Sequence, residues 1–127
     1  MNRMKLFVTV LFFISVISIT SFAEPDHYFA QSGNERASYI ENGEQVTNRW
    51  VQNIKGNWYY CGSDGYLLKD TWLHDPINGK YYYLGSDWAM LHDTTTPDGY
   101  TVGSDGAWVK DGKVVVETVK TITEQTK

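Results

Sequence analysis

The sequence predicts an all-β fold, a short solenoid of β-hairpins that follows an N-terminal signal peptide. Three observations predict it. An apolar segment near the N-terminus ends in small residues, an aromatic motif recurs at a step of 22 to 23 residues, and glycine-containing turns separate its copies. A fixed repeat period is typical of stacked units, because one small unit cannot bury its apolar face alone.

The first segment, residues 1–23, has the layout of a secretory signal peptide. Arg3 and Lys5 precede an apolar run over residues 6–19, and Ala23 ends a stretch of small residues before Glu24. The run has 14 residues, whereas a membrane span needs about 20. We therefore expect a secreted mature chain that begins at Glu24 and has no membrane contact after cleavage. An uncleaved N-terminal anchor is the alternative.

The charge of the mature chain argues against a nucleic-acid partner. Cleavage would remove two of the 11 basic residues and none of the 15 acidic ones, which leaves a net charge of −6. Nucleic-acid binding requires clustered Lys and Arg, whereas an acidic chain is compatible with a cationic ligand. All five Trp and all nine Tyr lie after the signal peptide, more aromatic side chains than a core of this size requires.

The repeat array is predicted over residues 37–109. Residues 24–36 are polar and without periodicity, so we expect a flexible lead-in there, and residues 39–50 are interpreted as the second half of an incomplete first copy. Residues 50–68 and 72–91 form two full copies, each a Trp-led strand, a turn and a Tyr-rich strand.

Turn chemistry places the bends of these hairpins. Lys55-Gly56-Asn57 and Ile77-Asn78-Gly79 separate the two strands of each full copy, and Gly supplies the positive φ that tight hairpin turns need. Asp64-Gly65 and Asp105-Gly106 mark the links to the next copy.

The C-terminal part contains a shortened third copy and a possible cap. The copy runs from about residue 95 to residue 109, and Asp111-Gly112 then predicts a closing hairpin between residues 107–109 and 114–116. We assign residues 110–127 as a capping strand or a tail, and the sequence leaves that choice open.

The motif resembles a known family. A Trp, a glycine-containing turn, Trp58-Tyr59-Tyr60 and the link Gly62-Ser63-Asp64-Gly65 are similar to the cell-wall-binding repeats of Gram-positive bacteria, the choline-binding and glucan-binding repeat family. The resemblance covers residues 37–109. It implies hairpins that stack in a left-handed superhelix, with ligands held between successive hairpins by aromatic side chains.

Position by position, the resemblance implies two ligand sites. The first is walled by one hairpin and closed by the next, and the second uses the following pair of copies, with a tyrosine in place of the second-strand tryptophan. The first site comprises Trp50, Trp58, Tyr82 or Tyr83, and Met90; the second comprises Trp72, Tyr81 and Tyr100. The chain departs from the family pattern where Trp88 replaces the glycine that ends the link and Thr95 replaces the leading tryptophan.

The function implied by the resemblance is binding of a cell-wall polymer, through choline on teichoic acid. Aromatic faces recognise a quaternary ammonium through cation–π contacts. Two alternatives stay open. The same aromatic faces would suit an α-glucan or another carbohydrate, and degenerate repeats would suit a small structural or protein-interaction module.

Catalytic chemistry is not predicted. His74-Asp75 and His92-Asp93 resemble catalytic pairs, but adjacent residues of a strand point to opposite faces. Cys61 has no histidine placed to activate it, and we interpret it as a buried, inert thiol, with an intermolecular disulfide as the alternative. The sequence has no calcium or phosphate loop. We therefore expect neither an enzyme nor a metal or cofactor.

Overall fold

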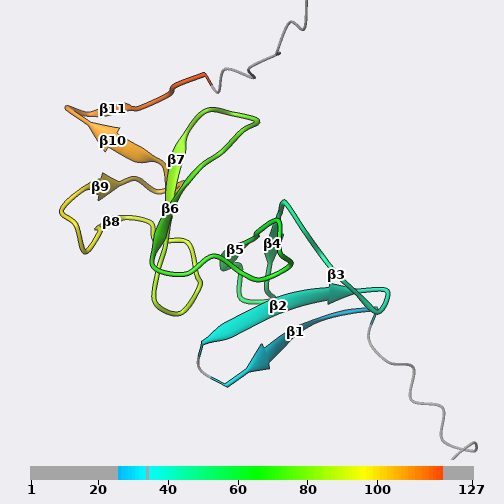
Figure 1. Cartoon of the computed structure of the whole chain (residues 1–127). Helices are drawn as coiled ribbons and strands as arrows, with labels where there is room; N and C mark the ends of the chain where they lie inside the picture. Colours follow the sequence, from blue (N-terminus) through cyan, green and yellow to red (C-terminus); the bar gives the residue numbers. More distant parts are fainter. Residues whose placement is uncertain (1–25, 34, 119–127) are drawn as a thin grey trace, which may run out of the picture.

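The computed structural model describes residues 26–33 and 35–118, so the predicted signal peptide over residues 1–23 lies outside the described residues. Over these residues the chain forms eleven strands and no helix, which confirms the predicted all-β hairpin array (Figure 1). No helix able to span a membrane occurs within the same residues. The strands are β1 His27–Ser32, β2 Arg36–Glu41, β3 Glu44–Gln45, β4 Arg49–Gln52, β5 Trp58–Cys61, β6 Thr71–His74, β7 Tyr81–Leu84, β8 Thr94–Thr95, β9 Thr101–Val102, β10 Trp108–Lys110 and β11 Lys113–Val114.

The two central hairpins form as the sequence predicts. In β4–β5, Trp50 pairs with Tyr60, and in β6–β7, Trp72 pairs with Tyr83. Each hairpin reverses through a glycine with positive φ, 88° at Gly56 and 72° at Gly79. Glycine adopts this left-handed conformation without the steric cost that a Cβ atom brings.

Successive hairpins are joined by backbone hydrogen bonds that run from each link to the preceding hairpin. The amide of Leu67 donates to the carbonyl of Ala37 at 2.7 Å, and the amide of Met90 donates to the carbonyl of Trp58 at 2.8 Å. An isolated bridge between Tyr82 and Ala107 continues the pattern into the third copy. The hairpins are therefore stacked units, and the links hold the stack together.

The lead-in prediction is wrong for the residues that form β1. β1 and β2 pair over six residues, with Phe29 opposite Tyr39 in the same relation as Trp50 to Tyr60. The Phe29 ring lies 4.9 Å from the Tyr39 ring and 5.0 Å from the Tyr59 ring, measured between centroids. Phe29 takes the place of the leading Trp in this hairpin, and its neighbours are polar, so its signal is weaker than that of the two full copies. Pairing with β2 and contact with the next hairpin stabilise it.

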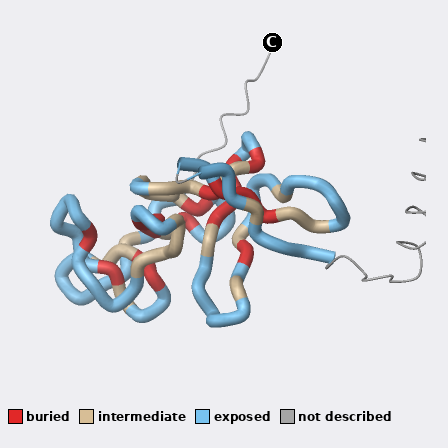
Figure 2. Tube along the Cα trace, turned by 90° about the horizontal axis from the view of Figure 1, so that it is seen from below, coloured by how far each residue is buried: buried red, intermediate tan, exposed pale blue. Residues whose placement is uncertain are grey.

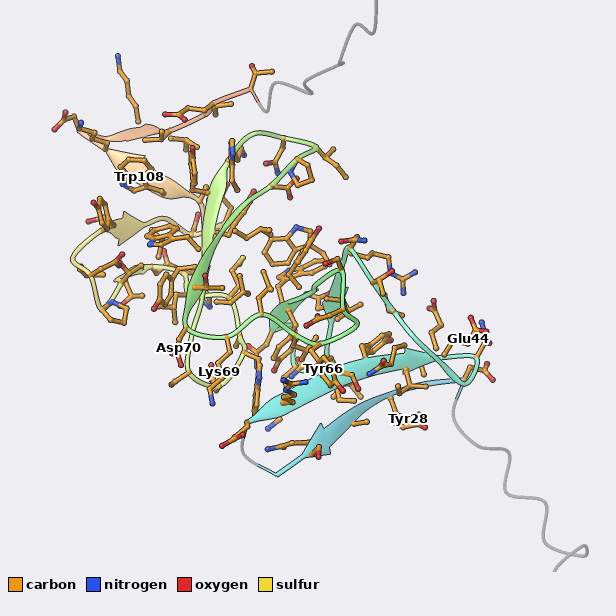
Figure 3. All side chains as sticks on the ribbon, viewed as in Figure 1. Tyr28, Glu44, Tyr66, Lys69, Asp70 and Trp108 are labelled. Atoms are coloured by element: carbon orange, nitrogen blue, oxygen red, sulfur yellow. The ribbon has the colours of Figure 1, made fainter. Side chains whose placement is uncertain are left out.

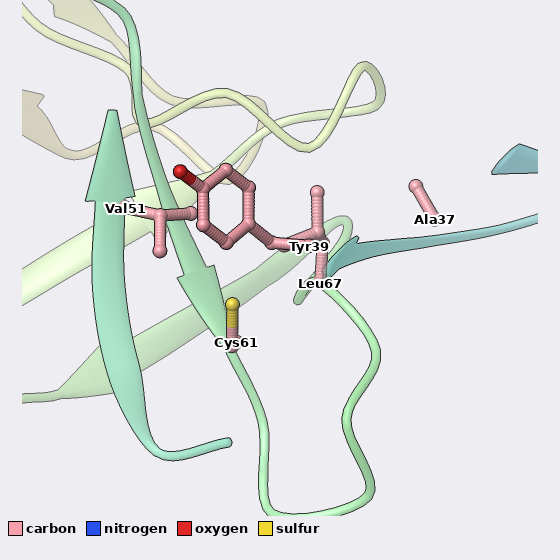
Figure 4. Close-up of a cluster of buried hydrophobic side chains, with 5 residues drawn as sticks. All are labelled: Ala37, Tyr39, Val51, Cys61 and Leu67. Carbon is pink, nitrogen blue, oxygen red and sulfur yellow. The ribbon is translucent and has the colours of Figure 1, made fainter. Parts of the chain in front are cut away.

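The core is a narrow line along the array. Cys61, Leu84 and Val102 are the largest fully buried side chains. Each immediately precedes the first residue of a link, Gly62, Gly85 or Gly103, which we call the link glycine. Around Cys61 the cluster includes Tyr39 and Val51 (Figure 4). Buried segments alternate with exposed ones throughout the chain trace (Figure 2). Burial of Cys61 agrees with the interpretation of an inert thiol.

The C-terminal part folds back on the second full hairpin. The predicted closing hairpin is β10–β11, in which Val109 pairs with Val114. Beyond it, Val116 forms an isolated bridge with Lys80, and the amide of Glu117 donates to the carbonyl of Gly79 at 2.9 Å. Residues 113–117, which we call the C-terminal strap, are therefore ordered against the β6–β7 turn. The predicted tail beyond residue 118 lies outside the described residues.

Candidate functional site

Two aromatic hollows lie between successive hairpins. The first hollow has a volume of about 520 Å³ and opens between β4–β5 and β6–β7. Four of the predicted site residues line it: Trp50, Trp58, Tyr82 and Met90. They come from both hairpins and from the link that follows the second, so the hollow exists only because the hairpins stack.

The aromatic rings of the first hollow meet at steep angles. The ring centroids of Trp50 and Trp58 are 6.4 Å apart with an interplanar angle of 87°. Tyr82 approaches Trp50 at 5.1 Å and 78°. Rings that meet edge to face stand as adjoining walls, and together these three rings line the first hollow.

A buried carboxylate fixes one of these walls. The indole Nε1 of Trp50 donates a hydrogen bond of 2.9 Å to Asp75, which is 4% exposed and also lines the first hollow. The other carboxylate oxygen of Asp75 accepts the amide of Ile77 at 2.8 Å. Asp75 therefore shapes the β6–β7 turn, orients Trp50 and places a negative charge at the hollow.

The second hollow repeats this arrangement one hairpin further along. Its volume is about 340 Å³, and its aromatic walls are Trp72, Tyr81, Tyr100 and Trp108. Tyr100 lies 5.7 Å from Trp72 at 90°, and 5.3 Å from Trp108 at 88°. All four of these walls are aromatic rings, whereas Met90 is one of the walls of the first hollow.

The indole of Trp72 is also held by a carboxylate. Its Nε1 donates a hydrogen bond of 2.8 Å to Asp98, which accepts a further one from the Thr96 hydroxyl. The bonds from Thr96 and Trp72 lower the pKa of Asp98 below its ordinary value, because they stabilise the ionised form. The second hollow thus has a carboxylate where the first has Asp75.

Trp108 is the wall residue that the sequence reasoning missed. Strand pairing sets Trp108 opposite Val102 and Met90 opposite Leu84, which makes Met90 and Trp108 equivalent. The signal was present in the sequence, since each of them stands five residues after a link glycine, Gly85 or Gly103. Trp108 extends from β10 beside the C-terminal part of the chain (Figure 3).

Tyr83 does not line the first hollow. Its ring packs on Trp72 at 5.3 Å, and its side chain is 8% exposed. Neighbouring residues of a strand point to opposite faces, so only one of Tyr82 and Tyr83 reaches the first hollow, and it is Tyr82. Of the other predicted residues, Trp72, Tyr81 and Tyr100 all line the second hollow.

The two His-Asp pairs differ. His74 stacks on Tyr81 with ring centroids 4.2 Å apart, while its neighbour Asp75 binds Trp50. His92 and Asp93 lie outside the strands, and their exposed side chains contact each other at 3.0 Å, so the expectation that neighbouring residues point to opposite faces is wrong for this pair. Within residues 26–33 and 35–118, no group of three His, Cys, Asp or Glu side chains is placed to hold a metal ion.

Family models match both central copies of the array. A model described as "Choline-binding repeat" matches residues 75–108, and one described as "Putative cell wall binding repeat" matches residues 48–67. These two ranges contain most of the walls of both hollows.

Solved choline-binding structures share the fold. The choline-binding domain of Spr1274 from Streptococcus pneumoniae is 27% identical with a TM-score of 0.54, and the match covers 70% of this chain and 99% of that domain. The pneumococcal cell-wall endolysin of phage Cp-1, solved with choline, is 30% identical with a TM-score of 0.55, over 71% of this chain and 27% of the endolysin.

A sequence relative comes from a different group of proteins. Glucosyltransferase-S of Streptococcus mutans is 40% identical over 40 residues, which are 32% of this chain and 3% of that enzyme. The chain therefore corresponds to a small part of the glucosyltransferase. It also corresponds to only part of the endolysin.

Proposed function

The chain is a cell-wall-binding repeat protein, and we propose that it anchors itself to choline groups of cell-wall teichoic acid through the first and second hollows. The observation that carries this proposal is the repetition of one constellation. Each hollow has a first-strand Trp, a second-strand aromatic, a Tyr from the next copy and a large side chain five residues after a link glycine. Two equivalent sites on one short array suit a polymer that repeats its ligand.

The walls suit a quaternary ammonium in particular. Such a cation has no hydrogen bond to donate, so recognition depends on electron-rich ring faces and on nearby negative charge. Each cation–π contact contributes about 0.5–1 kcal/mol at an exposed site and about 2 kcal/mol or more when desolvated. Asp75 lines the first hollow and Asp98 the second, and both add attraction for a cation while they orient the indoles.

In this proposal the protein is a non-catalytic module exported from the cell. His74 stacks on Tyr81, Asp75 binds the Trp50 indole and the β6–β7 turn, and Cys61 is buried. Export would use residues 1–23 as a cleaved signal peptide, in agreement with their apolar run and small residues before Glu24. The mature chain would then reside at the cell wall.

An α-glucan is the second candidate ligand. The similarity to a segment of glucosyltransferase-S favours it, because sugar rings also stack on Trp and Tyr faces. The steep ring angles in both hollows favour the cation, since a sugar ring stacks best on an open, flat aromatic strip.

Affinity chromatography distinguishes the two ligands. We expect the protein to be retained on a resin that carries choline-like trimethylammonium groups, to elute with free choline, and to pass through a dextran resin. Elution must occur at a choline concentration at which sodium chloride of equal ionic strength fails. Retention on dextran alone would identify an α-glucan, and not choline, as the ligand. Passage through both resins would contradict the proposed function.

A further inference from the structure

The C-terminal strap contacts a wall residue of the second hollow through one carboxylate. Tyr81 donates its hydroxyl hydrogen bond to Glu117 at 2.7 Å. The backbone carbonyl of Glu117 lies 2.8 Å from Nε2 of His74, and its amide binds Gly79. Glu117 is therefore attached to the β6–β7 hairpin by three separate contacts, although it lies 36 residues from Tyr81 in the sequence.

Close packing at the β6–β7 turn fixes the path of the strap. A Cβ atom placed on Gly79 would lie 2.6 Å from the carbonyl oxygen of Glu117. Only a glycine allows this approach, and the same glycine has the positive φ that the turn requires. The strap and the turn are thus fitted to each other.

Tyr81 depends on this support more than its counterpart in the first hollow does. The equivalent wall of the first hollow is Trp58, an indole without a hydroxyl group. Tyr81 is stacked on His74 with an interplanar angle of 6°, meets Trp108 edge-on at 5.7 Å, and has its hydroxyl fixed by Glu117. The hydrogen bond to Glu117 raises the pKa of Tyr81, which keeps the phenol protonated as the donor.

The carboxylate of Glu117 adds charge as well as a hydrogen bond. Within the described residues, 26–33 and 35–118, the ion pairs are Arg49 with Glu41, Lys80 with Asp105, and His92 with Asp93, so none of them neutralises Glu117. Together with Asp98 it makes two carboxylates that hydrogen-bond to wall residues of the second hollow. A cation in the second hollow would lie between Trp72 and Tyr81. The indole nitrogen of Trp72 contacts the Asp98 carboxylate, and the hydroxyl of Tyr81 contacts the Glu117 carboxylate.

We propose that Glu117 is a positioning and specificity residue of the second hollow: it holds the Tyr81 ring and biases the site toward cations over neutral ligands of the same shape. The inference rests on the proposed function, since it concerns a site that binds quaternary ammonium. It also gives the strap a role in binding beyond closing the end of the array.

The test compares choline with its neutral isostere, 3,3-dimethylbutan-1-ol, by calorimetry. The full chain carries Trp58→Leu, so that the first hollow is disabled and the signal comes from the second. Glu117→Gln keeps an oxygen that accepts from Tyr81 and removes the charge, whereas Glu117→Ala removes both. Glu44→Gln is the matched control, because Glu44 is exposed in β3 at the opposite end of the array (Figure 3).

We expect Glu117→Gln to weaken choline binding about twofold to fivefold, the size expected of an exposed opposite charge, and to leave binding of the neutral isostere unchanged. Glu117→Ala should weaken both ligands, because the Tyr81 ring is released, and Glu44→Gln should change neither. The inference is overturned if Glu117→Gln leaves choline affinity unchanged or weakens both ligands equally. Failure of the proposed function gives a different result. The unsubstituted chain would then bind no choline, and this would contradict both the proposed function and the role of Glu117.

Discussion

At the scale of single residues, position within the repeat decides whether a side chain becomes core or wall. Residues immediately before a link glycine, such as Cys61 and Leu84, are fully buried. Residues five places after a link glycine differ: Leu67 packs in the core, whereas Met90 and Trp108 line the hollows. The aromatic motifs and the family resemblance predicted seven of the wall residues, including Met90. Trp108 was missed because its equivalence to Met90 becomes visible only when the two are counted from Gly85 and Gly103.

Burial of Cys61 predicts an alkaline limit to stability. Desolvation raises the pKa of its thiol to about 11, whereas a thiol in the unfolded chain ionises near 8.5. The raised pKa means that the thiol's contribution to stability is fully present below about pH 8.5 and is lost as the pH rises toward 11, because the unfolded chain releases the proton first. Urea unfolding at pH 8, 9.5 and 11 should show this decline.

Substitution isolates the contribution of the thiol. Cys61→Ala should make the decline between pH 8.5 and pH 11 shallower. A part should remain, since burial also raises the pKa of Tyr39 and of Tyr60. An equally steep decline in Cys61→Ala would show that the thiol is not the group responsible.

At the scale of elements, hairpins with local signals were predictable. Hairpins β4–β5 and β6–β7 carry their own turn glycines and aromatic strands, so the sequence placed both of them and their turns. β1 carries aromatic residues of its own, and Gly33, with a φ of 62°, follows it, but no Trp leads this hairpin and the sequence reasoning passed over it. The strap is non-local, since it contacts the turn at Gly79 more than 30 residues earlier in the chain.

The link turns also show how tertiary contact can override local preference. Gly65 and Gly106 have φ values of 83° and 82°, and Trp88 occupies the equivalent position with a φ of 65°. A non-glycine residue in this conformation costs about 1–2 kcal/mol. The Trp88 ring packs against the core around Cys61 and lies under the Lys69 ammonium at 5.1 Å, contacts that offset the strain.

A pair of glycine substitutions tests whether the links shape the hollows. Gly106→Ala would bring a Cβ atom 2.5 Å from the Sδ atom of Met90, in addition to the strain of a φ of 82°. Gly112→Ala has comparable strain, with a φ of 75°, but no atom within 4 Å. We expect Gly112→Ala to lower the free energy of unfolding by about 1–2 kcal/mol, and Gly106→Ala to lower it by a further ~1 kcal/mol, because the flexible Met90 side chain must move aside.

Gly106→Ala should also weaken choline binding, because the displaced Met90 side chain is a wall of the first hollow. Chemical denaturation and calorimetry measure the two effects. Equal stabilities of the two variants, together with unchanged choline binding in both, would mean that the link at Gly106 does not control that wall.

At the scale of the whole molecule, the two hollows are a product of stacking. Neither hollow is complete within one hairpin, since the walls of each come from neighbouring copies. The proposed function therefore couples stability and binding through the same aromatic rings, as expected for repeat proteins whose units contact only their neighbours. The most N-terminal hairpin shows the limit of the pattern: Phe29 and Ala37 stand where Trp50 and Trp58 stand in the next one, and Phe29 packs directly on Tyr59.

Calorimetric titration with choline, with and without Trp58→Leu, tests most directly whether the stacked hollows are quaternary-ammonium sites. Leu keeps apolar bulk but removes the aromatic face, and the Trp58 side chain is 41% exposed, so the fold should survive by circular dichroism. Tyr28→Leu is the matched control, an exposed aromatic in β1 that lines neither hollow (Figure 3). The account predicts two bound choline molecules for the unsubstituted chain and for Tyr28→Leu, and one for Trp58→Leu. Two molecules bound with unchanged affinity by folded Trp58→Leu would contradict it.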